Sequence, residues 1–345
     1  MRFWTPPFTS GNSAVAVSSH HEGSIFTLAS RGEYLLSGSF DRSATVLRIC
    51  QIAKNDLVFT KIATLPEHTG WVRGVQIFSC EEGTFFLSIG CNLINVWQDC
   101  YGDDDDDTTA KRLARLDAGP SPEDPEDEAF RRHDILTISI LENDSCAFIL
   151  AGLVDGTLRA FDGRWGFWKN RRTPDGNYPY DNTGSCSKFD TDDDDKPFAT
   201  VRAHAGRVTG IHTLPHKKDE FISVGHDGYW RLWRLDRNTS SFWKLAEGAI
   251  GDGSSGDANG QDHDYRICSS ILLEENSLIL GTVVGEIYQV TFDMEDISNI
   301  QKTKLWSEET KGCSITALES SPSVSINEKF ALVAGNKDGM VHFFT

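Results

Sequence analysis

The stretch from His204 to Asp236 reads HAGRVTGIHTLPHKKDEFISVGHDGYWRLWRLD and holds three short apolar runs separated by polar turns. The first run begins at Val208, the second (221–224) leads into the turn 225–228 (GHDG), and the third ends on Trp233. Short runs with period-two alternation and turn residues between them are typical of β-strands joined as an antiparallel meander. The stretch therefore predicts one compact β unit.

The unit repeats along the chain with a fixed offset. Asp227 lies six positions before Trp233, and the same offset separates a turn residue from a bulky apolar residue at five other places. The six pairs are Asp41 and Leu47, Cys91 and Trp97, Asp155 and Phe161, Asp227 and Trp233, Val284 and Val290, and Asp338 and Phe344. The residues that begin the six repeats are, in order, His21, His68, His133, His204, His263 and Lys311. Such self-similarity indicates stacked units that bury a common core.

The fourth copy resembles a WD40 repeat, in which a His, an Asp and a Trp at these spacings mark one four-stranded blade of a β-propeller. The resemblance implies a buried hydrogen-bonded tetrad, whose members here are His204, Ser223, Asp227 and Trp233. Only this copy retains all four residue types. The resemblance also implies an all-β, WD40-like β-propeller, with six blades if each repeat forms one. Seven blades are the alternative, although 163–196, where a seventh could lie, shows no alternating strands.

The outer strand of each blade is expected in the connector after its third strand. Segments with strand character lie there at 57–65, 111–116, 198–203, 242–246 and 303–306. The sixth repeat reaches Thr345 without such a segment, whereas 13–18 (SAVAVS) is a spare strand near the other end. By the resemblance, this N-terminal strand completes the last blade and closes the propeller, which removes an exposed sheet edge.

Residues 1–345 are expected to form a single propeller domain with long connectors at about 99–132, 162–196 and 238–262. The first two connectors hold runs of Asp, which could bind Ca²⁺ because hard cations prefer carboxylate oxygens. However, no loop with alternating Asp residues, a Gly and a final Glu occurs in them. We interpret them as solvated acidic loops.

The 345-residue chain carries a formal net charge of −18, with 33 Lys and Arg against 51 Asp and Glu. This acidity argues against nonspecific binding to nucleic-acid phosphates, which needs clustered cations. The 8 Cys residues form no C-x-x-C pair, and no nucleophile, phosphate-loop or metalloprotease motif occurs. We therefore expect no metal, no cofactor and no catalytic site. No apolar run has the length of a signal or membrane segment, so a cytoplasmic or nuclear location is expected.

WD40 propellers commonly bind partners on the face that carries the turn into the first strand and the turn between the second and third strands. Residues just before the first strand and just before the Asp position project onto this face. Carried to this chain, those positions are Ser24, Phe40, Trp71, Val154, Arg207, His226, Arg266, Val283, Ser314 and Lys337. The candidate protein-binding residues among them are Phe40, Trp71, Arg207, His226, Arg266 and Lys337. An exposed Trp beside Arg side chains would attract an acidic or aromatic peptide.

The segment 163–172 (GRWGFWKNRR) interleaves aromatic and basic residues, which can stack on bases and contact phosphates. Its candidate nucleic-acid contacts are Trp165, Trp168, Lys169, Arg171 and Arg172. The Asp run 192–195 in the same connector opposes this role. The alternative is that the two Trp side chains cover the edge of a blade.

These features favour a non-catalytic scaffold or adaptor, a monomeric propeller that binds other proteins within a complex and makes no contact with a membrane. A subunit of an RNA-binding or RNA-modification complex is the second hypothesis, with contact through 164–172 or through a partner. A propeller-based hydrolase is the third, and the sequence offers no site for it. The fold alone does not choose among them, because propellers host unrelated activities.

Overall fold

Strands and turns make up the described part of the chain. The computed structural model describes residues 2–3, 16–17, 20–53, 56–66, 68–80, 83–98, 111–119, 134–143, 146–163, 196–214, 216–236, 238–251, 265–274, 276–293, 300–307, 313–321, 331–338 and 340–344. Within these ranges the chain forms 25 β-strands and no helix. A helix with the length and apolarity to cross a membrane is accordingly not found in them.

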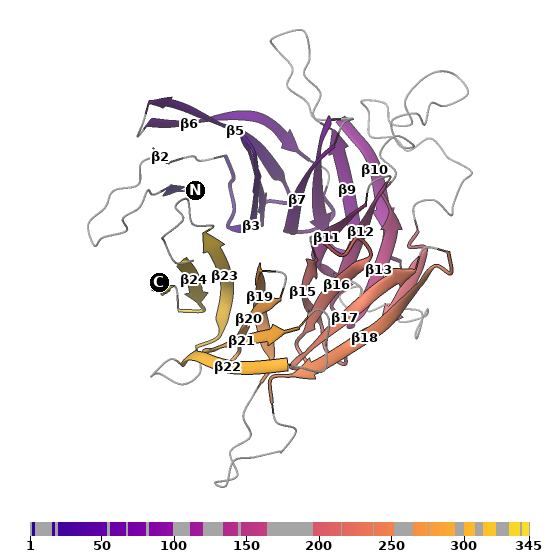
Figure 1. Ribbon diagram of the computed structural model, residues 1–345. Helices are drawn as coiled ribbons and strands as arrows, with labels where there is room; N and C mark the ends of the chain where they lie inside the picture. The colour runs from indigo at the N-terminus through magenta and orange to yellow at the C-terminus, as the bar shows by residue number, and fades with distance from the viewer. Residues whose placement is uncertain are drawn as a thin grey trace. The chain divides into compact units, whose positions relative to one another are not determined.

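Six antiparallel sheets follow one another along the described chain, and consecutive strands pair in each (Figure 1). We number them blade 1 to blade 6. Blade 1 contains β3 (Ile25–Arg31), β4 (Tyr34–Ser39), β5 (Ala44–Ala53) and β6 (Asp56–Leu65). Blade 2 contains β7 (Val72–Cys80), β8 (Gly83–Gly90), β9 (Leu93–Gln98) and β10 (Lys111–Asp117). Blade 3 contains β11 (Ile135–Asn143), β12 (Cys146–Leu153), β13 (Thr157–Asp162) and β14 (Ala199–Arg202). Blade 4 contains β15 (Val208–Thr213), β16 (Glu220–Gly225), β17 (Tyr229–Asp236) and β18 (Ser241–Ala249). Blade 5 contains β19 (Ile267–Glu274), β20 (Ser277–Thr282), β21 (Glu286–Phe292) and β22 (Ile300–Ser307). Blade 6 contains β23 (Ile315–Ser321), β24 (Ala331–Asn336) and β25 (Val341–Phe344). The all-β, six-bladed propeller fold predicted from the repeats is confirmed.

The spacing of six residues in each repeat runs from the turn between the second and third strands to an apolar residue in the third strand. The six apolar marker residues lie in β5, β9, β13, β17, β21 and β25. Five of them are buried, as expected of inward-facing positions on a pleated strand, and the sixth, Phe344, is half-buried. The spacing therefore identified the blades because it counts residues between a fixed turn and a fixed core position.

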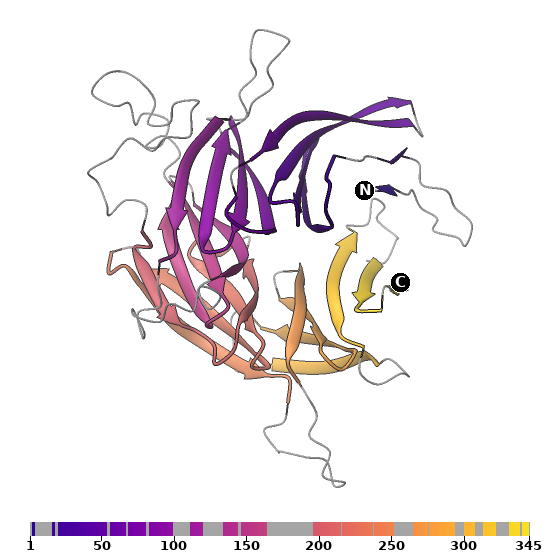
Figure 2. The ribbon, with the colours of Figure 1, turned by 180° about the vertical axis from the view of Figure 1, so that it is seen from behind.

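The predicted outer strands are also present. They are β6, β10, β14, β18 and β22, each paired with the third strand of its blade. Two of them, β10 and β18, lie inside the expected connectors 99–132 and 238–262, as the predicted segments 111–116 and 242–246 do. The connector segments 99–110, 120–133, 164–195 and 252–264 lie outside the described residues. In blade 1, β5 and β6 are ten residues long and extend beyond β3 and β4 (Figure 2).

The N-terminal segment pairs differently from the prediction. β2 (Ala16–Val17) is antiparallel to β1 (Arg2–Phe3), with Ala16 opposite Phe3. Blade 6 has β23, β24 and β25 and no fourth strand among the described residues. Of the expected closing strand 13–18, the described residues 16–17 thus pair locally with β1 and not with blade 6, and a local pairing costs less chain entropy.

Contacts separate the chain into two compact units, which we describe individually. The first comprises Met1–Ile138, Cys146–Phe148 and Phe161–Pro197, and the second comprises Ser139–Ser145, Ile149–Ala160 and Phe198–Thr345. Blades 1 and 2 belong to the first unit, blades 4, 5 and 6 belong to the second, and blade 3 contributes segments to both.

Each unit has an apolar core between neighbouring blades. In the first unit, side chains of β4 and β5 pack against those of β7, β8 and β9. In the second unit, side chains of β16 and β17 pack against those of β19, β20 and β21. Trp230 is central there, because it is 1% exposed and stacks on Phe292 with ring centroids 5.7 Å apart. Gly248 leaves room for it, since a Cβ at that position would lie 2.7 Å from the indole.

Trp230→Ala is expected to lower the free energy of unfolding by about 3 to 5 kcal/mol, because the change opens a cavity between blades 4 and 5. The matched control is Trp243→Ala in β18, where the side chain is 57% exposed; a change of about 0.5 kcal/mol or less is expected there. Urea denaturation of both variants measures the difference. Equal losses would mean that the blade 4 and blade 5 interface does not hold this unit together.

Candidate functional site

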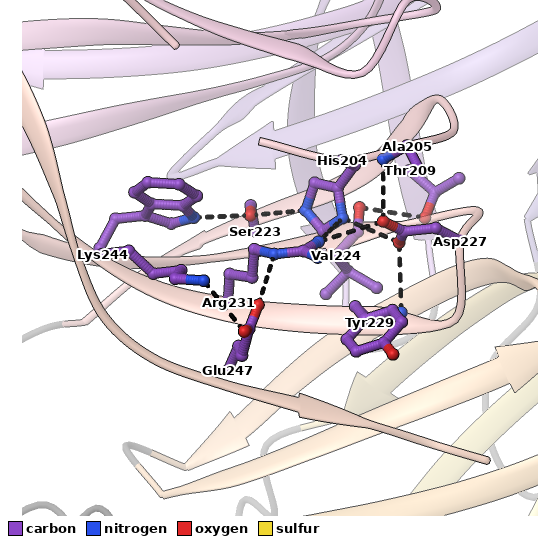
Figure 3. A network of polar contacts seen from close by, with 11 residues as sticks. His204, Ala205, Thr209, Ser223, Val224, Asp227, Tyr229, Arg231, Lys244 and Glu247 are labelled. Carbon is purple, nitrogen blue, oxygen red and sulfur yellow. Dashed lines mark hydrogen bonds and ion pairs between the residues drawn. The ribbon is translucent and has the colours of Figure 1, made fainter. Parts of the chain in front are cut away.

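The predicted tetrad of blade 4 is assembled in the structure (Figure 3). The indole N–H of Trp233 donates to Ser223 Oγ at 2.8 Å, and Ser223 Oγ lies 2.7 Å from His204 Nε2. His204 Nδ1 lies 2.9 Å from Asp227 Oδ1. The backbone N–H of Ala205 donates to Asp227 Oδ2 at 3.0 Å. The chain of hydrogen bonds thus ties the turn before β15 to the second and third strands.

Arg231 extends this tetrad toward the surface, which the repeat pattern did not indicate. Its guanidinium donates to Asp227 Oδ2 at 3.1 Å and to Glu247 Oε2 at 3.0 Å (Figure 3). It also lies over the ring of Tyr229, 4.9 Å from the centroid. Burial raises the pKa of Asp227, but the hydrogen bonds from His204, Ala205 and Arg231 outweigh it and hold that pKa well below its usual range. Asp227 is therefore a fixed negative charge with a structural role.

Blades 1 and 2 contain incomplete versions of the tetrad. In blade 1, His21 Nδ1 lies 2.9 Å from Asp41 Oδ2 and Nε2 lies 2.8 Å from Ser37 Oγ, with Leu47 at the Trp position. Burial raises the pKa of Asp41, but the hydrogen bonds from Ser43, His21 and Glu22 N–H together lower it to about 2. This blade keeps the ionic half of the network.

Blade 2 keeps the other half. His68 Nε2 lies 2.7 Å from Ser88 Oγ, and Trp97 donates to the same oxygen at 3.0 Å. His68 Nδ1 has the carbonyl oxygen of Arg42 as its partner at 3.1 Å, which replaces the missing Asp. The turn between β8 and β9 is also one residue shorter than in blade 4, since Ser and Trp are 9 positions apart there and 10 in blade 4. The offset that led to Cys91 therefore does not identify a true counterpart of Asp227.

The residue before the first strand and the residue before the Asp position, which the sequence analysis placed on one binding face, are neighbours in the structure. In four blades the residue before the Asp position donates its backbone N–H to the carbonyl of the residue before the first strand, at 2.8 to 3.0 Å. The pairs are Phe40 with Ser24, His226 with Arg207, Val283 with Arg266, and Lys337 with Ser314. The side chains of Arg207 and His226 also meet, with Nη2 donating to Nε2 at 3.1 Å.

Phe40 and Trp71 form part of a cluster of exposed aromatic rings in the first unit. Their rings stack with centroids 4.5 Å apart and planes 28° apart. Phe26 joins them, with centroids 6.2 Å from Phe40 and 6.0 Å from Trp71. The exposed fractions of Phe26, Phe40 and Trp71 are 49%, 46% and 39%. We call these three residues the aromatic cluster.

Phe26 was missed by the sequence analysis, and a β-bulge explains why it is exposed. The register of β3 against β4 shifts between Ile25 and Thr27, so Phe26 is the extra residue and its side chain is re-aimed. The first strands of blades 2, 4, 5 and 6 shift at the corresponding point, at Arg73, Thr209, Cys268 and Thr316. The apolar spacing of three between Val72 and Val75 is a sequence signal for such a bulge, because it breaks the alternation.

Arg73, the bulged residue of blade 2, borders the aromatic cluster. Its guanidinium lies over the ring of Trp71, 5.2 Å from the centroid. Its Nη1 also lies 3.7 Å from Asp134 Oδ2. The cluster thus combines partly exposed aromatic rings with a guanidinium that is held by one ring and one carboxylate.

The candidate RNA contacts Trp165, Trp168, Lys169, Arg171 and Arg172 lie outside the described residues. His133, His263 and Lys311, which begin three of the repeats, also lie outside them. Among the described residues, no group of three or more His, Cys, Asp or Glu side chains is placed to hold a metal ion.

The comparisons with known proteins agree with this architecture. Residues 195–234, which include β14 to β16 and part of β17, match the family described as WD domain, G-beta repeat. The crystal structure of Sqt1 from Chaetomium thermophilum is similar with a TM-score of 0.61 and 15% sequence identity, covering 97% of this chain and 72% of that one. No curated protein matches the sequence. One repeat of the chain, at 195–234, therefore matches the WD40 family. The likeness to Sqt1 shows a shared β-propeller fold and, at 15% identity, nothing beyond the fold.

Asp227→Ala and Trp233→Ala are expected to destabilise the protein more than Asp41→Ala or Phe344→Val. Removing Asp227 leaves His204 and the partly buried Arg231 without their shared carboxylate, at a cost of about 2 to 4 kcal/mol. Asp41 has no Arg partner among the described residues, and Phe344 is only half-buried. Thermal unfolding of the four variants measures the order, and comparable shifts in melting temperature would contradict it.

The buried His residues are expected to make the protein less stable at mildly acidic pH. Burial lowers the pKa of His68 to about 4, whereas in the unfolded chain it is 6.5. The unfolded state therefore binds more protons between these values, so the free energy of unfolding falls as the pH drops from about 6.5 toward 4. His68 contributes about 2 to 3 kcal/mol to this fall. Urea denaturation of wild type and His68→Asn at several pH values checks it, since the variant should show a smaller slope.

Proposed function

We propose that this protein is a non-catalytic scaffold whose partner proteins dock on the aromatic cluster of blades 1 and 2. The observation that carries the proposal is the exposure of three neighbouring aromatic rings, Phe26, Phe40 and Trp71, each between 39% and 49% exposed. WD40 propellers generally bind other proteins. Exposed apolar groups that gather in one place often mark such contacts.

The cluster also continues along β3. Leu28 is two residues from Phe26 on the same strand and is 52% exposed. Aromatic side chains dominate the energetics of protein interfaces because one ring buries a large apolar area with few rotatable bonds. Together these residues expose several large apolar side chains to a partner segment.

The rings are mounted on a rigid support, which favours binding. The backbone N–H of Phe40 donates to the carbonyl of Ser24 at 2.9 Å, and the adjacent Asp41 is held by His21. Trp71 directly precedes β7. Because these turns are already ordered, little conformational entropy is lost when a partner docks.

A photo-crosslinking experiment tests the proposal. Benzoylphenylalanine is placed at position 40 or, as the matched control, at position 243 in the exposed part of β18. Crosslinks to defined partner peptides are expected from position 40, and Trp71→Ala in the same chain should reduce them about tenfold or more, as for an interface hot spot. Mass spectrometry of the crosslinked peptides gives the readout.

The control variants separate a docking effect from a folding effect. Arg207 precedes the first strand of blade 4, as Trp71 precedes that of blade 2. Arg207→Glu should reduce crosslinking from position 40 only if the partner also contacts blade 4. Melting temperatures within a few degrees of wild type show that each variant is folded. The proposal fails if positions 40 and 243 yield the same partners, or if Trp71→Ala leaves the crosslinks unchanged.

A further inference from the structure

We propose that the segment bound by the aromatic cluster carries an arginine, whose guanidinium packs on the exposed aromatic rings while its N–H groups reach a neighbouring carboxylate. This inference rests on the proposed docking function and specifies the chemistry of the partner. It replaces the acidic peptide considered from the sequence.

The chain itself shows how such a guanidinium is held. Arg73 lies over the ring of Trp71, 5.2 Å from the centroid, and its other contact is the carboxylate of Asp134. In blade 4, Arg231 lies over Tyr229 and donates to both Asp227 and Glu247. In both places a planar cation is bound by an aromatic face and a carboxylate together, which suits arginine better than lysine.

The aromatic cluster offers the same two components in an open form. Phe26 and Phe40 are about half exposed, so their rings are accessible to a partner. The exposed residue Glu22 is close to them, because its backbone N–H donates to Asp41 Oδ2 at 3.0 Å. A Cβ on the next residue, Gly23, would lie 3.1 Å from Cβ of Phe40. A carboxylate is therefore carried on the turn that lies beside Phe40.

The net charge of the whole chain favours a cationic partner, and the cluster carries carboxylates beside its guanidiniums. The described charged residues on the cluster's turns, or paired with Arg73, include the carboxylates Glu22, Asp41 and Asp134 and the guanidiniums Arg42 and Arg73. Asp41 stays ionised at neutral pH, because its hydrogen bonds hold its pKa at about 2. The net charge of −18 adds long-range attraction for a basic segment and repels an acidic one.

A displayed library of random peptides provides the test. The library is selected on the wild-type protein after removal of peptides that bind the Phe40→Ala, Trp71→Ala double variant. Selected peptides are expected to be enriched in arginine. Synthetic versions in which citrulline, lysine or glutamate replaces the arginine are then measured by fluorescence anisotropy, since citrulline keeps the planar shape and loses the charge.

Citrulline is expected to weaken binding about tenfold and lysine about threefold, and glutamate should abolish it. Phe40→Leu, which keeps apolar area and loses the ring, should weaken the arginine peptide about threefold to tenfold. Glu22→Gln should weaken binding of the arginine peptide less than Phe40→Leu does, and Trp243→Ala should leave this binding unchanged. Melting temperatures confirm that each variant is folded.

The outcomes distinguish this inference from the proposed function. Cluster-dependent peptides without arginine, or equal binding of arginine and citrulline, would overturn the arginine proposal and leave docking on the cluster intact. Selection of acidic peptides would do the same and restore the acidic partner. If no peptide binds wild type better than the double variant, both the docking site and its arginine specificity are rejected.

Discussion

The blades depend on one local constraint, which is that the turn entering the first strand is held against the turn between the second and third strands. A backbone hydrogen bond of 2.8 to 3.0 Å makes this link in four blades, and in blades 1 and 4 a His and Asp pair reinforces it. Both turns are then fixed in position. Side chains such as Phe40 can therefore stand exposed without being disordered, which a free loop could not achieve.

The unequal polar networks follow from the cost of a buried polar group that lacks a partner. In blade 1 the Trp is replaced by Leu47, and Ser37 Oγ donates to the carbonyl of Thr45 at 3.3 Å. In blade 2 the Asp is missing, and the carbonyl of Arg42 serves His68. In blade 2 a backbone oxygen thus takes the place of the missing carboxylate, whereas in blade 1 the lost Trp was a donor and Ser37 keeps His21 as its side-chain partner. A blade can therefore lose one residue of the tetrad and still form. One complete copy, in blade 4, is enough to recognise the repeat.

Features encoded by local spacing could be predicted from the sequence, whereas those that depend on a single inserted residue or on a neighbouring blade could not. The fixed interval from turn to third strand identified all six blades and their outer strands, and it placed the tetrad of His204. It failed at Cys91, because the turn of blade 2 is one residue shorter. It also missed Phe26, since strict alternation does not allow for a bulge. The bond from His68 to the carbonyl of Arg42 joins two blades and has no signature within either repeat.

Blades 1 and 4 use the same chemistry for different purposes. In blade 4 the ring of Tyr229, the guanidinium of Arg231 and two carboxylates satisfy one another within the blade, so the turn is stabilised and its charges are neutralised internally. In blade 1 the rings of Phe26 and Phe40 remain about half exposed beside Glu22. Burying these rings would lower the free energy by about 25 cal/mol for each Å² of apolar surface removed from water. A partner that supplies a cation gains that burial together with the ion pair, so the turn of blade 1 is a better binding surface than the internally satisfied turn of blade 4.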